Sequence, residues 1–298
     1  MKSMNLVFCF RVARLLALRR IVGAERIRED YDRLSEGYDA HFSRYVARHS
    51  LSMLEGVGLA AGDRVLDLAC GTGTLALAAA AAVGERGEVV AVDRSHGMLR
   101  VADEKRRRLG FNNIRFVHAD MAVAVRDLAD ESFDVVTCAW AIGYANPPRL
   151  LRDIARKLRP GGKTGLIENR RDTLAPIRRT ALRVAQARPG DLQCLMDLHR
   201  RLPRDTTQLR RWFGGAGLTP RDAWEGHEPF VFARGADVLD WVLHTGASAG
   251  FDRMMSARSK EQCDRLFAEF IERDFMQNGT IAVAHRYVAG VAVREPAG

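Results

Sequence analysis

The chain lacks any C-x-x-C pair, because its five cysteines are scattered at positions 9, 70, 138, 194 and 263. This scatter excludes the usual zinc frameworks, and an odd number of cysteines does not suggest a closed set of disulfides. Disulfides persist in oxidising compartments and are rare in the cytosol. We therefore expect a cytoplasmic protein that holds no metal.

A long uninterrupted apolar run is also missing. The N-terminal stretch from Leu6 to Ile21 is apolar but carries arginines at positions 11, 14, 19 and 20. It is too interrupted to span a bilayer, and it lacks the order of a signal peptide. Two alternatives stay open: a basic helix on the inner face of an anionic membrane, or a disordered or loosely docked leader. On a helical wheel, Arg19 falls among Phe8, Val12 and Leu15, so the amphipathic pattern is imperfect.

Signatures of nucleic-acid binding are absent although the net charge is +9. No zinc-finger spacing and no aromatic-rich RNA-binding motif accompanies the arginines. We expect no nucleic-acid partner. The charge fits an anionic substrate, an anionic membrane surface or a generally arginine-rich composition.

The chain does contain a strand, a glycine turn and a helix in one stretch, RVLDLACGTGTLALAA, from Arg64 to Ala79. Its apolar start has the length of a buried strand, and its alanine-rich end has high helix propensity. Gly71 and Gly73 allow a sharp turn and the close approach of a ligand. The amide groups at the start of the helix then face that ligand.

This elbow also fits the dinucleotide fingerprint G-x-G-x-x-G/A. Asp67 separates the two interpretations, because a carboxylate just before the turn would repel a pyrophosphate. S-adenosylmethionine carries an ammonium and a sulfonium and no phosphate, so an acidic residue suits it. A nicotinamide-dependent oxidoreductase is therefore the weaker interpretation.

Strands alternate with helices five times, which predicts a doubly wound, Rossmann-like parallel sheet. A sixth strand is expected within Leu218–Phe232, and a seventh, antiparallel to it, over Thr280–Val291. We expect a leader over residues 1–30 and one domain over residues 31–298, with a helical lid insertion at about 170–216. The five parallel strands are expected at 65–68, 88–92, 114–117, 133–138 and 163–168, the last after a turn at 159–162.

Acidic residues lie at the ends of three of these strands. Asp67 is the last residue but one of the first, Asp93 directly follows the second, and Asp120 lies just past the third. Ligands of such sheets bind at the carboxyl ends of the strands, beside the first turn. Asp93 lies where an acidic residue would bind a ribose hydroxyl pair. The converging carboxylates are a stronger signal than the glycines alone.

At this point the chain resembles the class I S-adenosylmethionine-dependent methyltransferases. The resemblance rests on Asp67–Gly73, Asp93, Asp120, Phe133–Val136 and Leu158–Gly162, and it covers about Tyr31 to Glu168. Within the class, the chain is most similar to the methyltransferases of ubiquinone and menaquinone biosynthesis. No Asn-Pro-Pro-Tyr sequence of nucleic-acid methyltransferases is present, because Asn146-Pro147-Pro148 is followed by Arg149.

The resemblance implies that the cofactor is S-adenosylmethionine, and it implies a role for each matching residue. Asp67 and the turn formed by Ala69, Cys70, Gly71, Thr72 and Gly73 would hold the methionine part. Asp93 would bind the ribose, and Arg94, Met98, Asp120 and Met121 would surround the adenine. Ala139 and Trp140 would lie near the methyl group, and Tyr38 would close the pocket from the N-terminal side.

The apolar and aromatic residues expected above the strand ends favour methyl transfer to a small, largely apolar acceptor of quinol, polyketide or lipid type, on carbon or oxygen. Residues expected near that acceptor are Tyr31, His41, Phe42, Ile142 and Tyr144. Two alternatives stay open: an N-methyltransferase of phospholipid or other amines at the membrane surface, and a non-catalytic binding protein. No catalytic base is assigned, although His41, His199, His227, His244 and His285 are candidates by residue type.

Overall fold

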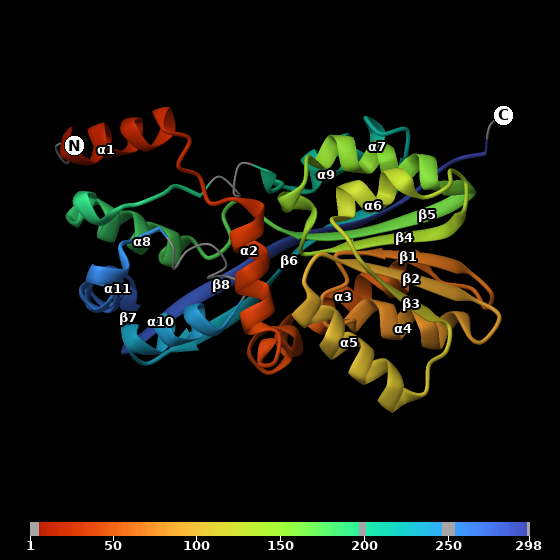
Figure 1. Ribbon diagram of the computed structural model, residues 1–298, viewed down its shortest axis with the longest axis horizontal. Helices are drawn as coiled ribbons and strands as arrows, with labels where there is room; N and C mark the ends of the chain where they lie inside the picture. Colours follow the sequence, from red (N-terminus) through yellow and green to blue (C-terminus); the bar gives the residue numbers. More distant parts are fainter. Residues whose placement is uncertain (1–5, 197–200, 246–253, 297–298) are drawn as a thin grey trace. The chain divides into compact units, whose positions relative to one another are not determined.

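The computed structural model describes residues 6–196, 201–245 and 254–296 (Figure 1). The described chain divides into two compact units. The first comprises residues 1–30, 172–197 and 227–285, and the second comprises residues 31–171, 198–226 and 286–298. His199 lies outside the described residues.

The sheet has the strand order β3-β2-β1-β4-β5-β8-β6 in the described residues, with a short β7 paired to β8. Strands β1 to β5 pair in parallel, and β8 pairs with β5 in antiparallel fashion. The strands are β1 (Arg64–Leu68), β2 (Glu88–Asp93), β3 (Ile114–His118), β4 (Phe133–Ala139), β5 (Leu158–Asn169), β6 (Thr219–Phe232), β7 (Met276–Gln277) and β8 (Thr280–Val293).

Eleven α-helices lie in the described residues. They are α1 (Leu6–Ala17), α2 (Ala24–Leu34), α3 (Arg44–Val57), α4 (Thr74–Val83), α5 (His96–Leu109), α6 (Met121–Asp127), α7 (Pro147–Lys157), α8 (Ala175–Ala187), α9 (Thr206–Gly214), α10 (Gly235–His244) and α11 (Lys260–Phe275). A π-helical turn, η1 (Asp39–Ser43), leads into α3, and a 3-10 turn, η2 (Ile142–Tyr144), follows β4. None of the described helices is both long enough and apolar enough to cross a membrane.

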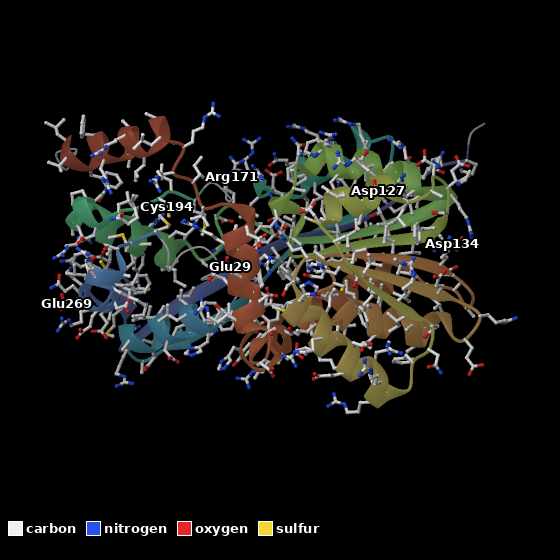
Figure 2. The ribbon with its side chains drawn as sticks, viewed as in Figure 1. Glu29, Asp127, Asp134, Arg171, Cys194 and Glu269 are labelled. Atoms are coloured by element: carbon white, nitrogen blue, oxygen red, sulfur yellow. The ribbon has the colours of Figure 1, made fainter. Side chains whose placement is uncertain are left out.

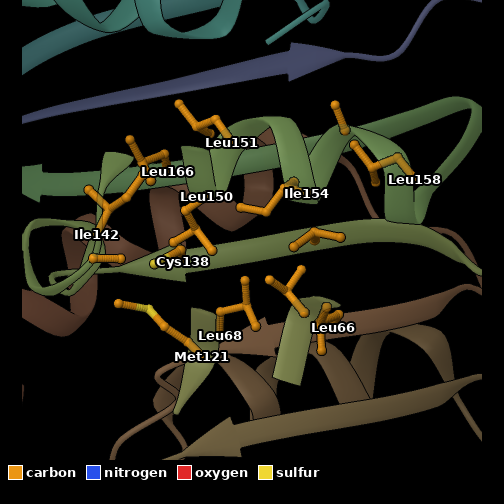
Figure 3. Close-up of a cluster of buried hydrophobic side chains, with 14 of the residues drawn as sticks. Leu66, Leu68, Met121, Cys138, Ile142, Leu150, Leu151, Ile154, Leu158 and Leu166 are labelled. Carbon is orange, nitrogen blue, oxygen red and sulfur yellow. The ribbon is translucent and has the colours of Figure 1, made fainter. Parts of the chain in front are cut away.

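In the second unit, helices cover both faces of the parallel strands. Helices α6, α7 and α9 pack on one face, and α3, α4 and α5 pack on the other (Figure 1). Leu66 and Leu68 of β1 point into the first of these cores, where Leu150 and Ile154 of α7 are fully buried (Figure 3). Strands buried on both faces explain the nearly continuous apolar runs of β1, β2 and β4.

The first unit has its own apolar core, in which α8, α10 and α11 contribute Val184, Val238 and Phe267. A smaller cluster joins Leu15 of α1 to Ala185 and Leu192. Helix α1 is thus packed against the rest of this unit through Leu15.

The predicted fold class is confirmed, including the antiparallel strand near the C-terminus. Two expectations were wrong in detail. The short β7 was not predicted, and residues 159–162 form no separate turn but lie within β5. There the pairing with β4 passes from Leu158 to Lys163, so these four residues bulge out of register. Gly161 takes a left-handed conformation in this bulge, with φ of 82°.

Candidate cofactor and acceptor site

The glycine turn after β1 leaves open space above the end of the strand. Gly71 and Gly73 have φ values of 55° and 87°. A Cβ built on Gly71 would meet no atom within 4 Å, so a ligand can approach the backbone there. Because β1 lies between β2 and β4, this turn is at the switch point of the sheet, where ligands of such folds bind.

Asp67 presents a buried carboxylate beside this turn. Thr137 Oγ1 of β4 donates to Asp67 Oδ1 at 2.8 Å, whereas Oδ2 has no hydrogen-bond partner among the described residues. Burial raises the pKa of Asp67 to about 7, the Thr137 hydrogen bond opposes this rise, and nearby Asp93 adds to it. A cationic ligand group at this position would satisfy the open oxygen and restore the charged form.

Asp93 ties the ends of β1 and β2 together. Its Oδ2 accepts from the Gly71 amide and its Oδ1 from the Ser95 amide, each at 2.8 Å. Burial raises the pKa of Asp93, and these two amide bonds hold the rise in check. Each carboxylate oxygen has a second lone pair, which leaves acceptor capacity for ligand hydroxyls.

Asp120 caps α6 through a hydrogen bond from the Ala122 amide to Oδ1, at 2.9 Å. Its Oδ2 lies 3.8 Å from an Arg94 guanidinium nitrogen, so the two predicted adenine residues are neighbours. Met98 is buried in the first turn of α5. Met121 packs instead into the core beneath α6, beside Leu68 (Figure 3).

At the ends of the parallel strands, two residues other than glycine take the left-handed conformation: Ala69 after β1 and Trp140 after β4, with φ of 57° and 59°. Such strained positions cluster at binding sites, where the surrounding structure holds them. Trp140 is anchored by its indole nitrogen, which donates to Ser50 Oγ at 2.8 Å, and by edge-on packing against Tyr287. Ala139 packs beside it.

An aromatic cluster forms next to these strand ends. Tyr31 packs edge-on against both Tyr38 and Tyr144, and Tyr38 packs against Phe42 with ring centroids 5.3 Å apart. The hydroxyl groups of Tyr31 and Tyr144 are 2.8 Å apart. Burial is the main cause that raises the pKa of Tyr38, and the charges of Tyr144 and Asp93 add to it.

Glu168, at the end of β5, was missed by the sequence analysis. It is buried, and its Oε2 accepts from the Gly143 amide of η2 at 3.0 Å, while its Oε1 accepts from the Asn169 amide at 2.7 Å. Burial raises the pKa of Glu168 to about 7. Glu168 therefore holds the turn that carries Tyr144. The sequence did carry a signal for Glu168, because this residue ends the fifth predicted strand, as the three predicted aspartates lie at the ends of other strands.

The segment before β1 contributes two further carboxylates that were not predicted. Asp39 of η1 accepts from Thr72 Oγ1 at 2.6 Å and forms an ion pair with Lys105. Burial acts to raise the pKa of Asp39, but the bonds from Lys105 and Thr72 lower it overall. Asp32 Oδ1 accepts from Ser95 Oγ and the Gly97 amide. Both contacts fix the N-terminal aromatic residues beside the glycine turn.

The structure gives the surroundings of three further predicted site residues. Ile142 has no exposed surface and belongs to the core under η2 (Figure 3), so it offers no contact to an acceptor. His41 is exposed, unlike its neighbour Phe42. Cys70 is buried in the turn after β1, and burial raises its thiol pKa well above the ordinary value.

The donor set fits S-adenosylmethionine. The open carboxylate oxygen of Asp67 suits a cationic group, the backbone at Gly71 leaves room for it, and Asp93 offers acceptors for a ribose. A doubly wound sheet with these residues at its switch point defines the class of S-adenosylmethionine-dependent methyltransferases.

Sequence comparisons agree with this class. Residues 65–162 match the methyltransferase domain family. The chain is 34% identical over 161 residues to a demethylmenaquinone methyltransferase of Geobacillus kaustophilus, covering 52% of this chain and 67% of that protein. It is 33% identical over 162 residues to the same enzyme of Anoxybacillus flavithermus, covering 52% of this chain and 66% of that protein. These matches span about two thirds of the relatives' length.

Among solved structures, the fold is similar to that of a putative methyltransferase from Bacillus halodurans. The TM-score is 0.57, with 22% identity, covering 82% of this chain and 98% of that chain. The chain belongs to the class I S-adenosylmethionine-dependent methyltransferases, and within them it resembles the quinone-biosynthesis type.

Proposed function

We propose that this enzyme transfers a methyl group from S-adenosylmethionine to the carbon or oxygen of a small, largely apolar acceptor of quinol, polyketide or lipid type. The observation that carries the proposal is the aromatic cluster of Tyr31, Tyr38, Phe42 and Tyr144, whose segments are bonded to the strand ends through Asp39 and Glu168. Aromatic walls with few polar groups suit an apolar ring better than a sugar or a free amino acid.

Different residues would hold the three parts of the cofactor. Asp67 and the turn from Ala69 to Gly73 would bind its methionine part, and Asp93 would bind its ribose. Arg94, Met98 and Asp120 would surround its adenine. When bound, the cofactor supplies a methyl group already activated on sulfur, so the protein mainly aligns the acceptor and excludes water.

The hydroxyl groups of Tyr31 and Tyr144 would bind the methyl acceptor. Each hydroxyl can donate or accept, so the pair can orient a phenolic or quinol oxygen. Glu168 acts as a positioning residue, because it holds the Gly143 amide and with it the turn that presents Tyr144. Trp140, anchored on Ser50, would form a fixed wall near the methyl group.

Relatives support this choice of acceptor, since those matched are demethylmenaquinone methyltransferases. Quinols with apolar tails partition into membranes. We therefore also propose that the enzyme is cytoplasmic and meets its acceptor at the anionic inner face of a membrane.

The test replaces Tyr144 and, separately, Trp140 by alanine and measures methyl transfer to a short-chain demethylmenaquinol, with Asp127→Ala as the control. Asp127 is an exposed carboxylate at the end of α6 (Figure 2). Turnover should fall at least tenfold in both variants, with cofactor affinity changed less. Unchanged turnover in both would show that the acceptor enters elsewhere. Transfer only to phosphatidylethanolamine would favour the amine N-methyltransferase instead.

A further inference from the structure

A cavity of about 660 Å³ lies in the first unit, at the C-terminal end of α1. Its lining includes five arginines, at positions 11, 14, 19, 20 and 26, and one carboxylate, Glu25. Arg28, which does not line the cavity, donates to Glu25 at 2.8 Å. Arginine stays charged in proteins and matches the geometry of phosphate with two parallel hydrogen bonds. The cavity is therefore strongly cationic and suited to phosphate groups.

The backbone turn that ends α1 places two of these arginines. The Arg19 amide donates to Leu16 O and the Arg20 amide to Leu15 O, which is the hydrogen-bond pattern of a Schellman cap. Arg19 occupies the left-handed position of this cap, with φ of 49°, where glycine is favoured. Because α1 ends at Ala17, Arg19 does not lie on the helix face among Phe8 and Val12, as the helical wheel implied.

Helix α1 is apolar on its outer side as well as on its docked side. Leu15 is buried against Ala185 and Leu192. Leu6, Val7 and Phe10 are exposed, with 77%, 65% and 73% of their surface accessible. No acidic residue occurs before Glu25 in the chain. Large apolar side chains gathered on one exposed face mark an interaction surface.

We propose that this face of α1 and the arginine cavity together dock on an anionic membrane, with Leu6, Val7 and Phe10 in the interface and the arginines on lipid phosphates. The proposal rests on the proposed function in one respect, because an apolar acceptor partitions into the same bilayer. Apolar insertion beside basic residues is the pattern of interfacial helices. Cys194, which also lines the cavity, is labelled in Figure 2.

Two other occupants fit the surface less well. A symmetric dimer through this face would bring the arginine groups of two copies together and repel. A nucleic acid would pair with the arginines but would leave the exposed leucine and phenylalanine side chains without apolar contacts. An anionic bilayer satisfies the charge and the apolar surface at once.

The experiment measures sedimentation of the full chain with vesicles of phosphatidylglycerol and phosphatidylcholine, and with vesicles of phosphatidylcholine alone. Arg19→Gly with Arg20→Gln removes two charges while placing glycine where the cap favours it. Leu6→Ser with Phe10→Ser removes the apolar contact. The matched controls are Arg107→Gln with Arg108→Gln on α5, and exposed Val123→Ser on α6.

The unaltered chain should bind only the anionic vesicles, and rising salt should release it. The double arginine variant should bind about tenfold more weakly or worse, since each basic residue near an anionic surface contributes roughly fivefold. The apolar variant should lose binding even at low salt, and both controls should retain it. Equal sedimentation of all variants with the vesicles would overturn the proposal. It would also be overturned if the unaltered chain formed dimers, the α1 variants did not, and none of these proteins bound vesicles.

Calorimetry with S-adenosylhomocysteine distinguishes a failure of the membrane-docking proposal from a failure of the proposed function. Both α1 variants should bind the cofactor product as the unaltered chain does. Vesicle binding without any methyl transfer to apolar acceptors would refute the proposed function alone. Methyl transfer to a soluble acceptor without vesicle binding would refute the docking proposal alone.

Discussion

The hydroxyl groups of Tyr31 and Tyr144 lie 2.8 Å apart, although 113 positions separate the two residues in the chain. This hydrogen bond joins α2 to the turn after β4. The Gly143 amide of that turn donates to Glu168, which fixes the turn to the end of β5. The segment that precedes the sheet is thereby fixed beside the strand ends. The proposed acceptor wall is thus held in place by contacts within the protein.

Removing either hydroxyl should weaken this link. We expect Tyr31→Phe and Tyr144→Phe each to lower the free energy of unfolding by about 0.5–1.5 kcal/mol, because each removes a hydrogen bond between two partly buried hydroxyls. The double variant should show a coupling of about 0.5–1.5 kcal/mol in urea unfolding. Strictly additive single effects would indicate that the two hydroxyls do not interact in solution.

The ribose assignment predicts a large loss of affinity in Asp93→Ala. A hydrogen bond to a charged group contributes roughly 1.5–3 kcal/mol, so the dissociation constant for S-adenosylhomocysteine should rise at least tenfold. Asp127→Ala serves as the exposed control. Because Asp93 also binds the Gly71 and Ser95 amides, circular dichroism must first show that the variant folds. An unchanged dissociation constant in the folded variant would place the ribose partner elsewhere.

Cofactor affinity should depend on pH through Asp67. Its pKa of about 7 means that much of the unliganded protein is protonated there below neutrality. A cationic ligand favours the carboxylate, so affinity should increase as the pH rises from 6 to 7.5 and protons should be released on binding. Calorimetry in buffers of different ionisation enthalpy measures that release. Asp67→Asn should bind weakly with a flatter profile; an identical pH dependence in both proteins would exclude Asp67 as the cause.

Glu168 should make stability depend on pH with the opposite sense from an ordinary salt-bridged carboxylate. Its pKa rises from 4.5 when unfolded to about 7 when folded, so the folded state binds the extra proton between these values. The free energy of unfolding should therefore decrease as pH rises from 4.5 to 7, by at most about 1.4 kcal/mol per pH unit from this group. Denaturation of the unaltered chain and Glu168→Gln at several pH values measures the difference. The same slope in both proteins would contradict the assignment.

The sequence was sufficient to predict the parallel strands and the carboxylates at their ends. Apolar runs, the glycine turn and the spacing of Asp67 and Asp93 are local signals that the sheet topology brings together. Gly71 and Gly73 form the turn that was predicted after the first strand. These features depend on residues near one another in the chain or on one edge of the sheet.

The remaining contacts depend on packing between distant segments. Nothing in the sequence pairs Asp39 with Lys105 and Thr72, or Asp32 with Ser95, because these side chains meet only when the N-terminal helices dock. Periodicity also cannot tell which apolar residues at a strand end face the core. Ile142 and Met121 resemble pocket residues by position, yet both are buried beneath the sheet.

Methyl transfer by the enzyme is measured with S-adenosylmethionine that carries an isotopically labelled methyl group and a demethylmenaquinol-type acceptor, followed by mass spectrometry of the product. The unaltered chain should transfer one labelled methyl group per acceptor, and Asp93→Ala should transfer far less at the same cofactor concentration. Tight binding of S-adenosylmethionine with no labelled quinol, polyketide or lipid product would contradict the account.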